Sequence, residues 1–302
     1  MTQEAVQAAL SVYRHKLGSG DGSSEIITIS DGTFEIPPQA LAINQSESDI
    51  TAYLASRGLS TEVVTNPLNV VLVRTGDRLV LIDSGLGAVD AFGPTAGKLF
   101  DRLASAGLDV SQITDLALTH LHPDHAAGAV QAQEKGLLSD SVRMHVSQAE
   151  LDFWSGDTTG AFSDHPSGAG TGEFMTDCAR GFISTFDGKV NAFGDSDTIV
   201  AGITAKLTPG HTPGHAAFAI ENGGARFMFL GDALNASHFA NPGWHFFYDI
   251  DHPLAETTRR ALLEEIADSG TLISAAHMSF PALGTVSKDG GAYRFNPITW
   301  AY

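Results

Sequence analysis

Short apolar runs alternate along the chain with stretches in which apolar residues have helical spacing. Residues 69–74 and 78–82 form two apolar runs around a Thr-Gly-Asp turn, which predicts a β-hairpin. The second run is almost entirely apolar, as in a central strand covered on both faces. Residues 24–37 alternate between apolar and polar positions around Asp31-Gly32 and predict a further strand pair. Residues 1–20 predict a short polar helix and a linker.

The rest of the chain continues this alternation. Residues 94–108 and 254–268 have helical spacing, and residues 147–150 (SQAE) have the sequence of a capping box that starts another helix. Residues 155–173 are rich in Gly, Ser, Thr and Asp and predict a mobile loop, whereas residues 40–66 favour no element. Strands are predicted at residues 113–119, 142–146, 198–208, 216–221, 225–230 and 272–276.

Strands and helices therefore occur in two successive sets. This order predicts an α/β fold of two similar halves, whose sheets face each other and whose helices lie outside. No segment rich in linker residues divides the chain. We expect residues 1–302 to form a single domain, with residues 1–23 as an N-terminal extension.

Composition predicts a sizeable core and a strongly acidic surface. Hydrophobic residues make up 43% of the chain, enough to exclude wholesale disorder. The 35 acidic and 17 basic side chains give a formal charge of −18, which would repel nucleic-acid phosphates and anionic lipid. We expect no nucleic-acid or membrane partner, and a small neutral molecule as the substrate.

Cysteine content and the N-terminus bear on the compartment. Cys178 is the only cysteine, which excludes an intrachain disulfide and fits a reducing environment. The N-terminal residues lack a basic start followed by an apolar stretch, and no apolar run has the length of a membrane span. These features favour a cytoplasmic protein, or an exported one whose signal has been removed.

The segment THLHPDH at residues 119–125 is the strongest indication of a metal site. It follows a predicted buried strand, at the edge of the sheet where α/β sites form. In an extended chain, residues two apart point the same way, so His120 and His122 can hold one ion together. Asp124 and His125 follow as the chain turns and can point to a second ion. Imidazole and carboxylate are ligands that zinc binds well.

Three further predicted strands each end at a candidate ligand. These ligands are His211 in TPGHTPGH, Asp232 in FLGD and His277 in SAAH. Convergence of these ends with residues 120–125 would form one site with seven ligands. His215 could take the place of His211 as a ligand, but we favour a role in which it supports the ligands instead.

The order of H-x-H-x-D-H, TPGH, LGD and AAH resembles the metallo-β-lactamase superfamily. Within it, the chain is similar to the methyl parathion hydrolase group, which includes lactone- and aryl-ester-cleaving relatives. The likeness runs from about Tyr13 to Tyr302 and includes residues 81–85 (LIDSG), 92–95 (FGPT) and 293–297 (YRFNP). It implies the metallo-β-lactamase αββα sandwich, in which two mixed β-sheets face each other with helices outside.

The resemblance also implies roles for individual residues. His120, His122 and His211 would bind the first metal, Asp124, His125 and His277 would bind the second, and Asp232 would bridge both. Asp83 matches a position that orients a ligand histidine, although a turn aspartate before Gly85 is an equal alternative. Many acyl-homoserine lactonases have a tyrosine three residues after the bridging aspartate, where this chain has Asn235. This departure argues against a quorum-quenching lactonase, and Asn235 is itself predicted to line the substrate pocket.

The substrate pocket is less well defined by the resemblance. Phe92 and Trp154 match pocket-lining positions, and Phe174 and Trp244 are candidate substitutes for aromatic residues that the chain lacks. Ordinary core packing is an alternative for both of these. The aromatic residues 240–249 could line the pocket or cover the interface of a homodimer.

These features together predict a dinuclear metal-dependent hydrolase. Two divalent ions, zinc or alternatively manganese, iron or cobalt, would share a hydroxide that attacks the substrate, and Asp124 or Asp232 would accept a proton. Hydrophobic esters or lactones are the expected substrates, with phosphotriesters as additional ones. The alternatives are a non-catalytic metal-binding protein and a single-iron dioxygenase on the same fold.

Overall fold

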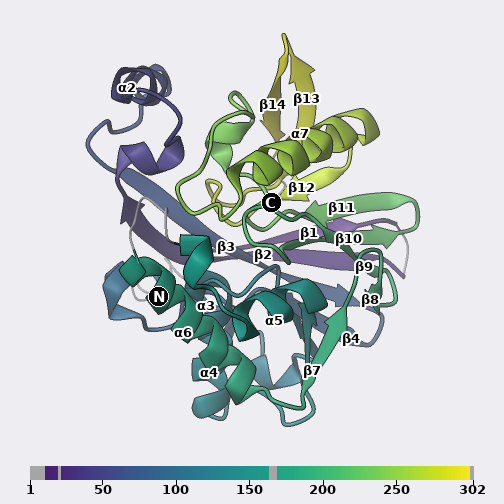
Figure 1. Cartoon of the computed structure of the whole chain (residues 1–302). Helices are drawn as coiled ribbons and strands as arrows, with labels where there is room; N and C mark the ends of the chain where they lie inside the picture. Colours follow the sequence, from purple (N-terminus) through teal and green to yellow (C-terminus); the bar gives the residue numbers. More distant parts are fainter. Residues whose placement is uncertain (1–10, 20–21, 163–168, 300–302) are drawn as a thin grey trace.

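Two seven-stranded sheets pack face to face, and helices cover their outer faces (Figure 1). The computed structural model describes residues 11–19, 22–162 and 169–299. The strand order of the first sheet is β1-β2-β3-β4-β5-β6-β7, and that of the second is β14-β13-β12-β11-β10-β9-β8. Both sheets are mixed, since β4 to β7 and the pair β11–β12 are parallel and the other pairs are antiparallel. The predicted αββα sandwich is therefore confirmed.

The elements have the following bounds. The first sheet consists of β1 (Val12–Leu17), β2 (Ser24–Ile36), β3 (Val64–Thr75), β4 (Arg78–Ile82), β5 (Asp115–Ala117), β6 (Arg143–Ser147) and β7 (Val190–Phe193). The second consists of β8 (Thr198–Val200), β9 (Ile203–Leu207), β10 (Ala216–Asn222), β11 (Ala225–Phe229), β12 (Leu272–Ser274), β13 (Gly284–Asp289) and β14 (Ala292–Pro297). The α-helices are α2 (Glu47–Ser56), α3 (Leu99–Ser105), α4 (Pro123–Glu134), α5 (Gln148–Ser155), α6 (Ala169–Thr185) and α7 (His252–Ser269).

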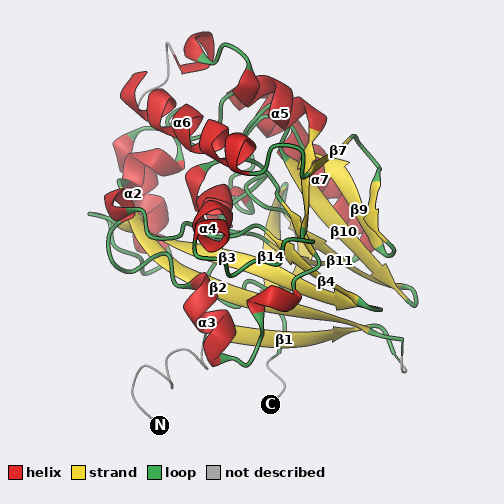
Figure 2. Cartoon of the chain, turned by 90° about the horizontal axis from the view of Figure 1, so that it is seen from below, coloured by secondary structure: helices red, strands yellow, loops and turns green. Residues whose placement is uncertain are grey.

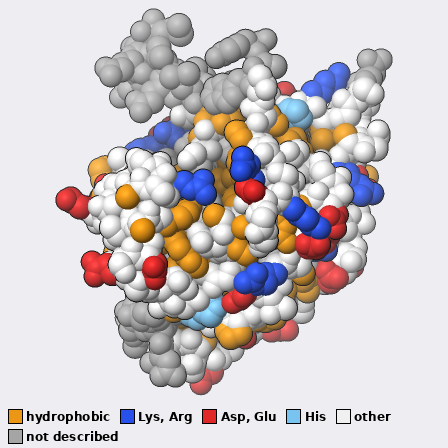
Figure 3. Space-filling model, turned by 90° about the horizontal axis from the view of Figure 1, so that it is seen from above, with side chains coloured by type: hydrophobic (Ala, Val, Ile, Leu, Met, Phe, Trp, Pro, Cys, Tyr) orange, Lys and Arg blue, Asp and Glu red, His pale blue; other side chains and the backbone are white. Residues whose placement is uncertain are grey.

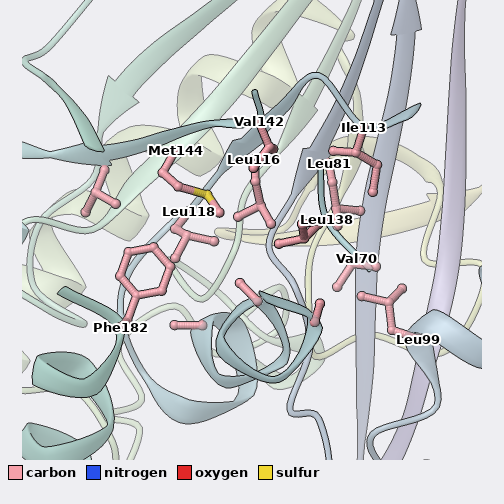
Figure 4. Close-up of a cluster of buried hydrophobic side chains, with 14 of the residues drawn as sticks. Val70, Leu81, Leu99, Ile113, Leu116, Leu118, Leu138, Val142, Met144 and Phe182 are labelled. Atoms are coloured by element: carbon pink, nitrogen blue, oxygen red, sulfur yellow. The ribbon is translucent and has the colours of Figure 1, made fainter. Parts of the chain in front are cut away.

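The central strands β3 to β5 of the first sheet are buried on both faces, which explains their nearly continuous apolar sequences. In β3, Val71 and Val73 belong to the core between the sheets, whereas Val70 and Leu72 belong to the core beneath the helices. This is the period of two expected of a strand. Figure 4 shows the helix-side core, where strand side chains meet Phe182 of α6. The helices α4, α5 and α6 cover this side, and α7 covers the second sheet (Figures 1 and 2).

The predicted strand pair at residues 24–37 is wrong, because β2 is one continuous strand with a bulge between Ser30 and Gly32. Gly32 has a φ of 122°, and a Cβ atom there would lie 2.0 Å from the carbonyl oxygen of Thr95. The Asp31 carboxylate accepts hydrogen bonds from the backbone N–H groups of Leu86 and Leu99. Asp31-Gly32 therefore ties β2 to the loop after β4, where a turn had been predicted.

The two ends of the described chain also differ from prediction. Residues 12–17 form strand β1, paired with β2, where a polar helix and linker were predicted. Strand β12 is not the last strand, because the hairpin β13–β14 follows it.

The early part of the predicted helix at residues 94–108 is irregular, and the helix itself is limited to α3.

The predicted loop at residues 155–173 is only partly a loop. Residues 159–162 form a 3-10 helix, and α6 begins at Ala169; residues 163–168 lie outside the described chain. Glycine at positions 170 and 172 disfavours a helix locally, but α6 packs against α4 and buries Phe182 completely. Tertiary packing therefore decides the structure of this segment.

The surface of the described residues gives two further observations. No helix among them is both long and apolar enough to cross a membrane. On the face drawn in Figure 3, lysine and arginine side chains lie in small groups next to acidic ones.

Candidate metal centre

The segment at residues 118–125 connects β5 to α4 and presents four candidate ligands. His120 and His122 precede the helix, and His122 is its N-cap residue, with an extended backbone at φ −62° and ψ 155°. Pro123 occupies the first helical position, where its missing N–H costs nothing. The helix begins there, so Asp124 and His125 lie in its first turn.

The other three candidate ligands approach from the second sheet. His211 lies between β9 and β10, Asp232 follows β11, and His277 follows β12. The Nε2 atom of His277 lies 2.9 Å from Asp232 Oδ2 and 3.4 Å from Asp124 Oδ2. The Nε2 atom of His211 lies 3.4 Å from Asp232 Oδ2.

All seven predicted ligands converge in the structure as three overlapping groups. Within each group, one nitrogen or oxygen atom from every residue lies within 4.8 Å of the others. The groups are His120–His122–His211, His120–His125–Asp232 and Asp124–His125–His277. This is a histidine and aspartate cluster that can bind metal, and it brings four strand ends to one point.

Several of the converging atoms are buried without a hydrogen bond. Nε2 of His120, His122 and His125 and Oδ1 of Asp232 have no hydrogen-bond partner among the described residues. A buried polar atom that lacks a partner costs about 1–3 kcal/mol. Their convergence is explained if cations complete their coordination, so the residues present fit a metal centre.

The protonation of the cluster fits the same interpretation. Burial, reinforced by neighbouring histidines, lowers the pKa of His120 and His122 well below its usual range. Both imidazoles are therefore neutral, and neutral imidazole is the form that binds a cation.

The other side of the cluster attracts positive charge. Burial opposes a charge on His277, but Asp232 and Asp124 outweigh it and raise the pKa of His277 to about 10. The same carboxylates, with Asp83, outweigh burial at His125 and raise its pKa well above the usual value. A field that holds protons on two buried imidazoles would equally stabilise a metal cation in their place.

Asp83 lies behind His125. Its Oδ2 accepts a hydrogen bond from His125 Nδ1 at 2.8 Å, and its Oδ1 accepts from the backbone N–H of Thr119 at 2.8 Å. Asp83 has a φ of 64°, so its backbone has the left-handed conformation at the end of β4. This geometry directs Nε2 of His125 towards the cluster and corresponds to the predicted orienting role.

His215 lies beside the cluster and not in any of the three groups. Its Nε2 accepts a hydrogen bond from the backbone N–H of Asp232 at 3.0 Å. Its Nδ1 lies 2.7 Å from the Thr208 hydroxyl and therefore donates to it. The structure thus places His211 at the cluster and His215 behind the backbone of Asp232.

A buried ion pair behind His211 was missed at the sequence level. Asp249 Oδ1 accepts a hydrogen bond from His211 Nδ1 at 2.9 Å, and Asp249 Oδ2 accepts one from Arg259 at 3.0 Å. Arg259 extends from α7 and also donates to the backbone carbonyls of Ala233, Pro242 and Trp244. One fully buried guanidinium therefore fixes the loop after Asp232 and the partner of His211.

Glu150 was predicted only as part of a capping box, and its side chain has a different role. Ser147 caps α5 as predicted, but the Glu150 carboxylate, 0% exposed, does not close the box. Its Oε1 accepts from the backbone N–H of Leu121 and from Trp154 Nε1, and its Oε2 accepts from Thr212 and Gly214. One carboxylate thus joins the loop of His120 and His122 to the loop of His211.

Replacement of Glu150 by glutamine should destabilise the protein and weaken metal binding. In one orientation the amide NH2 group would face the N–H groups of Leu121 and Trp154, and in the other it would face the N–H group of Gly214 beside the Thr212 hydroxyl. At least one buried N–H group therefore loses its acceptor, at a cost of about 1–3 kcal/mol. Thermal unfolding and metal titration would measure both effects, with Glu134→Gln at the exposed end of α4 as the control. Equal stability and metal affinity in the two variants would contradict this role.

A cavity of about 200 Å³ opens directly onto the cluster. Its apolar wall includes two residues predicted for the pocket, Phe92 and Phe174. Phe246 and Tyr248 also line the cavity, in agreement with the first of the two alternatives given for residues 240–249. The sequence did not identify Phe34, the remaining aromatic lining residue. The lining also includes Asn66, Ala91, Pro123, Thr171 and Met175.

The structure places the other three predicted pocket residues outside the lining of this cavity. Trp154 is fully buried beneath His122 and donates to Glu150. Trp244 packs edge-on against Tyr53 of α2, with ring centroids 4.9 Å apart. The side-chain oxygen of Asn235 caps a short 3-10 helix by accepting from Ser237.

The comparison with protein families covers most of the chain. A model described as Metallo-beta-lactamase superfamily matches residues 64–277, a range that contains the whole ligand cluster. Among curated proteins, a probable metallo-hydrolase of Mycobacterium tuberculosis is 28% identical over 183 residues. The match covers 55% of this chain and 56% of the relative, so the chain spans about half the length of that protein.

Two solved structures resemble nearly the whole chain. AidC, described as a dizinc quorum-quenching lactonase in complex with a product, has a TM-score of 0.87 at 24% identity, over 97% of this chain and 99% of its own. The hydrolase AbOPH of the beta-lactamase superfamily has a TM-score of 0.83 at 26% identity, over 96% of this chain and 98% of its own. The first of these is a likeness of fold alone.

Proposed function

The chain belongs to the metallo-β-lactamase superfamily, and on that premise we propose that it is a dinuclear metal-dependent hydrolase of hydrophobic esters or lactones. The observation that carries the proposal is the cluster of seven ligands with unpartnered buried atoms, at the end of an aromatic cavity. In this proposal His120, His122 and His211 hold one ion, Asp124, His125 and His277 hold the other, and Asp232 bridges them. Zinc is the expected metal.

Bound ions would supply an activated water and stabilise the negative charge that develops on the substrate oxygen. The chain contributes the positions of the ligands: Asp83, Asp249 and the carbonyl oxygen of Pro67 each accept from the Nδ1 atom of a ligand histidine. Asp124 lines the cavity, and its histidine neighbours outweigh burial and lower its pKa, so its carboxylate carries no proton. We propose that the Asp124 carboxylate accepts the proton released by the attacking water and returns it to the leaving oxygen as the ester bond breaks.

The proposed substrate class follows from the cavity wall. Phenylalanine and tyrosine rings surround the space above the cluster, and Lys and Arg are absent from its described lining. A neutral molecule with an apolar acyl or aryl part fits such a wall, and phosphotriesters are proposed as secondary substrates. The AidC description as a lactonase supports the lactone part of the proposal. Nucleic acid is not a proposed partner, because of the net charge of −18.

A panel of four substrates tests this function. Dihydrocoumarin, an aryl acetate and a long-chain lactone should be hydrolysed by the zinc-loaded protein, and methyl parathion should be hydrolysed more slowly. A chelator should abolish turnover, and added zinc should restore it. If protein that is shown to hold metal hydrolyses none of the four substrates, the proposed function is contradicted.

A further inference from the structure

Asn66 places an amide between a metal-ligand candidate and the cavity. It lies in β3 opposite Phe34 of β2, is 6% exposed, and lines the cavity. Its Nδ2 position lies 3.0 Å from Nδ1 of His277. Apart from the cluster, the polar side chains of the described cavity wall are those of Asn66, Thr171 and Tyr248.

The surroundings of His277 fix which of its nitrogens bears a proton. Its Nε2 faces Asp232 and Asp124 at 2.9 and 3.4 Å, so this is the atom that would bind a cation. Its Nδ1 lies 2.8 Å from the backbone carbonyl oxygen of Pro67, which can only accept a hydrogen bond. The Nδ1 atom therefore carries a proton, both when Nε2 binds a metal and when the imidazole is doubly protonated.

A protonated Nδ1 cannot accept a hydrogen bond from the Asn66 NH2 group. Two donors 3.0 Å apart repel each other, and a half-turn of the amide replaces the NH2 group by the oxygen. The oxygen of Asn66 then shares the Nδ1 proton with Pro67. This half-turn moves the NH2 group to the position now held by Oδ1. That position is not fully buried, and Oδ1 makes no hydrogen bond with the described residues.

From this we infer that Asn66 determines substrate specificity by donating a hydrogen bond from its side-chain NH2 group to an acceptor oxygen in the acyl part of the substrate. The inference rests on the proposed function, since it assumes that an ester or lactone occupies this cavity. A substrate with an amide or second carbonyl in its acyl part would satisfy the donor. A purely hydrocarbon acyl part would leave the NH2 group buried and unpaired, which disfavours binding.

The test compares two lactones that differ only in an amide within the side chain. Wild-type protein should prefer the amide lactone by about 3- to 10-fold in kcat/KM, which is the range for one hydrogen bond. Asn66→Asp offers a carboxylate oxygen to His277 but no donor to the cavity, so it should keep its metal and lose the preference. Asn66→Leu should lose the preference and also bind metal more weakly. Asn191→Asp, at an exposed position of β7, controls for the added charge.

Binding of the two hydrolysed products, measured by calorimetry on metal-loaded protein, gives a second readout that does not need turnover. The same preference should be seen in the dissociation constants and should be absent in Asn66→Asp. If the preference persists in Asn66→Asp, or if wild type shows none by calorimetry, the inference is overturned. If wild type binds the amide product selectively but hydrolyses neither lactone, the inference stands and the proposed function fails.

Discussion

Replacement of Asp232 by alanine is expected to reduce ester or lactone turnover by at least about 1,000-fold and to lower the metal content to one ion per chain or fewer. Asp232 is the residue that contacts ligands of both proposed ions: its oxygens lie 3.4 Å from His125 Nε2, 3.4 Å from His211 Nε2 and 2.9 Å from His277 Nε2. Without this carboxylate, the two proposed ions would lose the anionic group that they share, and the repulsion between them would be offset less.

Steady-state kinetics and elemental analysis of purified Asp232→Ala protein would measure both effects. Asp187→Ala, at an exposed position after α6, is the matched control and should behave like wild type. Retention of two ions per chain together with wild-type turnover would show that Asp232 does not bridge the proposed ions.

The second large effect is expected at the Asp249–Arg259 pair. Removal of one member leaves a buried charge without its partner, which typically costs 3–5 kcal/mol, so Arg259→Met should lower the free energy of unfolding by about that amount. Asp249→Ala should do the same and should also weaken metal binding about 10- to 100-fold, because it removes the acceptor of His211 Nδ1.

Chemical denaturation and metal titration would separate these two effects. Arg260→Met is the matched control on the same helix, since Arg260 pairs with Glu256 at the exposed surface and should contribute about 1 kcal/mol or less. The double variant Asp249→Leu/Arg259→Met should lose less stability than the sum of the single losses, because neither charge is then left alone. Strictly additive losses would mean that the pair is not coupled.

The ligands could be predicted from sequence because they lie in short motifs that come after strands. His120, His211, Asp232 and His277 all lie in short motifs at strand ends, and parallel or adjacent strands bring such ends together. The general arrangement of two facing sheets followed from the same alternation of elements. Both predictions depend only on residues that are close together in the sequence.

The supporting residues could not be predicted, because their partners are distant in sequence. Asp249 lies 38 residues from His211, and Glu150 lies 62 residues from Thr212, so no spacing rule connects them. The same holds for α6 and the Asp31 bulge, where packing overrides local preference. The two tryptophans fit a pocket by type alone, but Trp154 donates to the buried Glu150 and Trp244 packs against Tyr53, and neither lines the cavity.

Elemental analysis of the purified wild-type protein, loaded with zinc and freed of excess metal, tests the central claim most directly. The convergence of the seven ligands predicts about two zinc ions per chain. Only the zinc-loaded protein should hydrolyse lactones or esters. Protein that retains no metal after loading, or that hydrolyses the substrates equally well without it, would contradict the account.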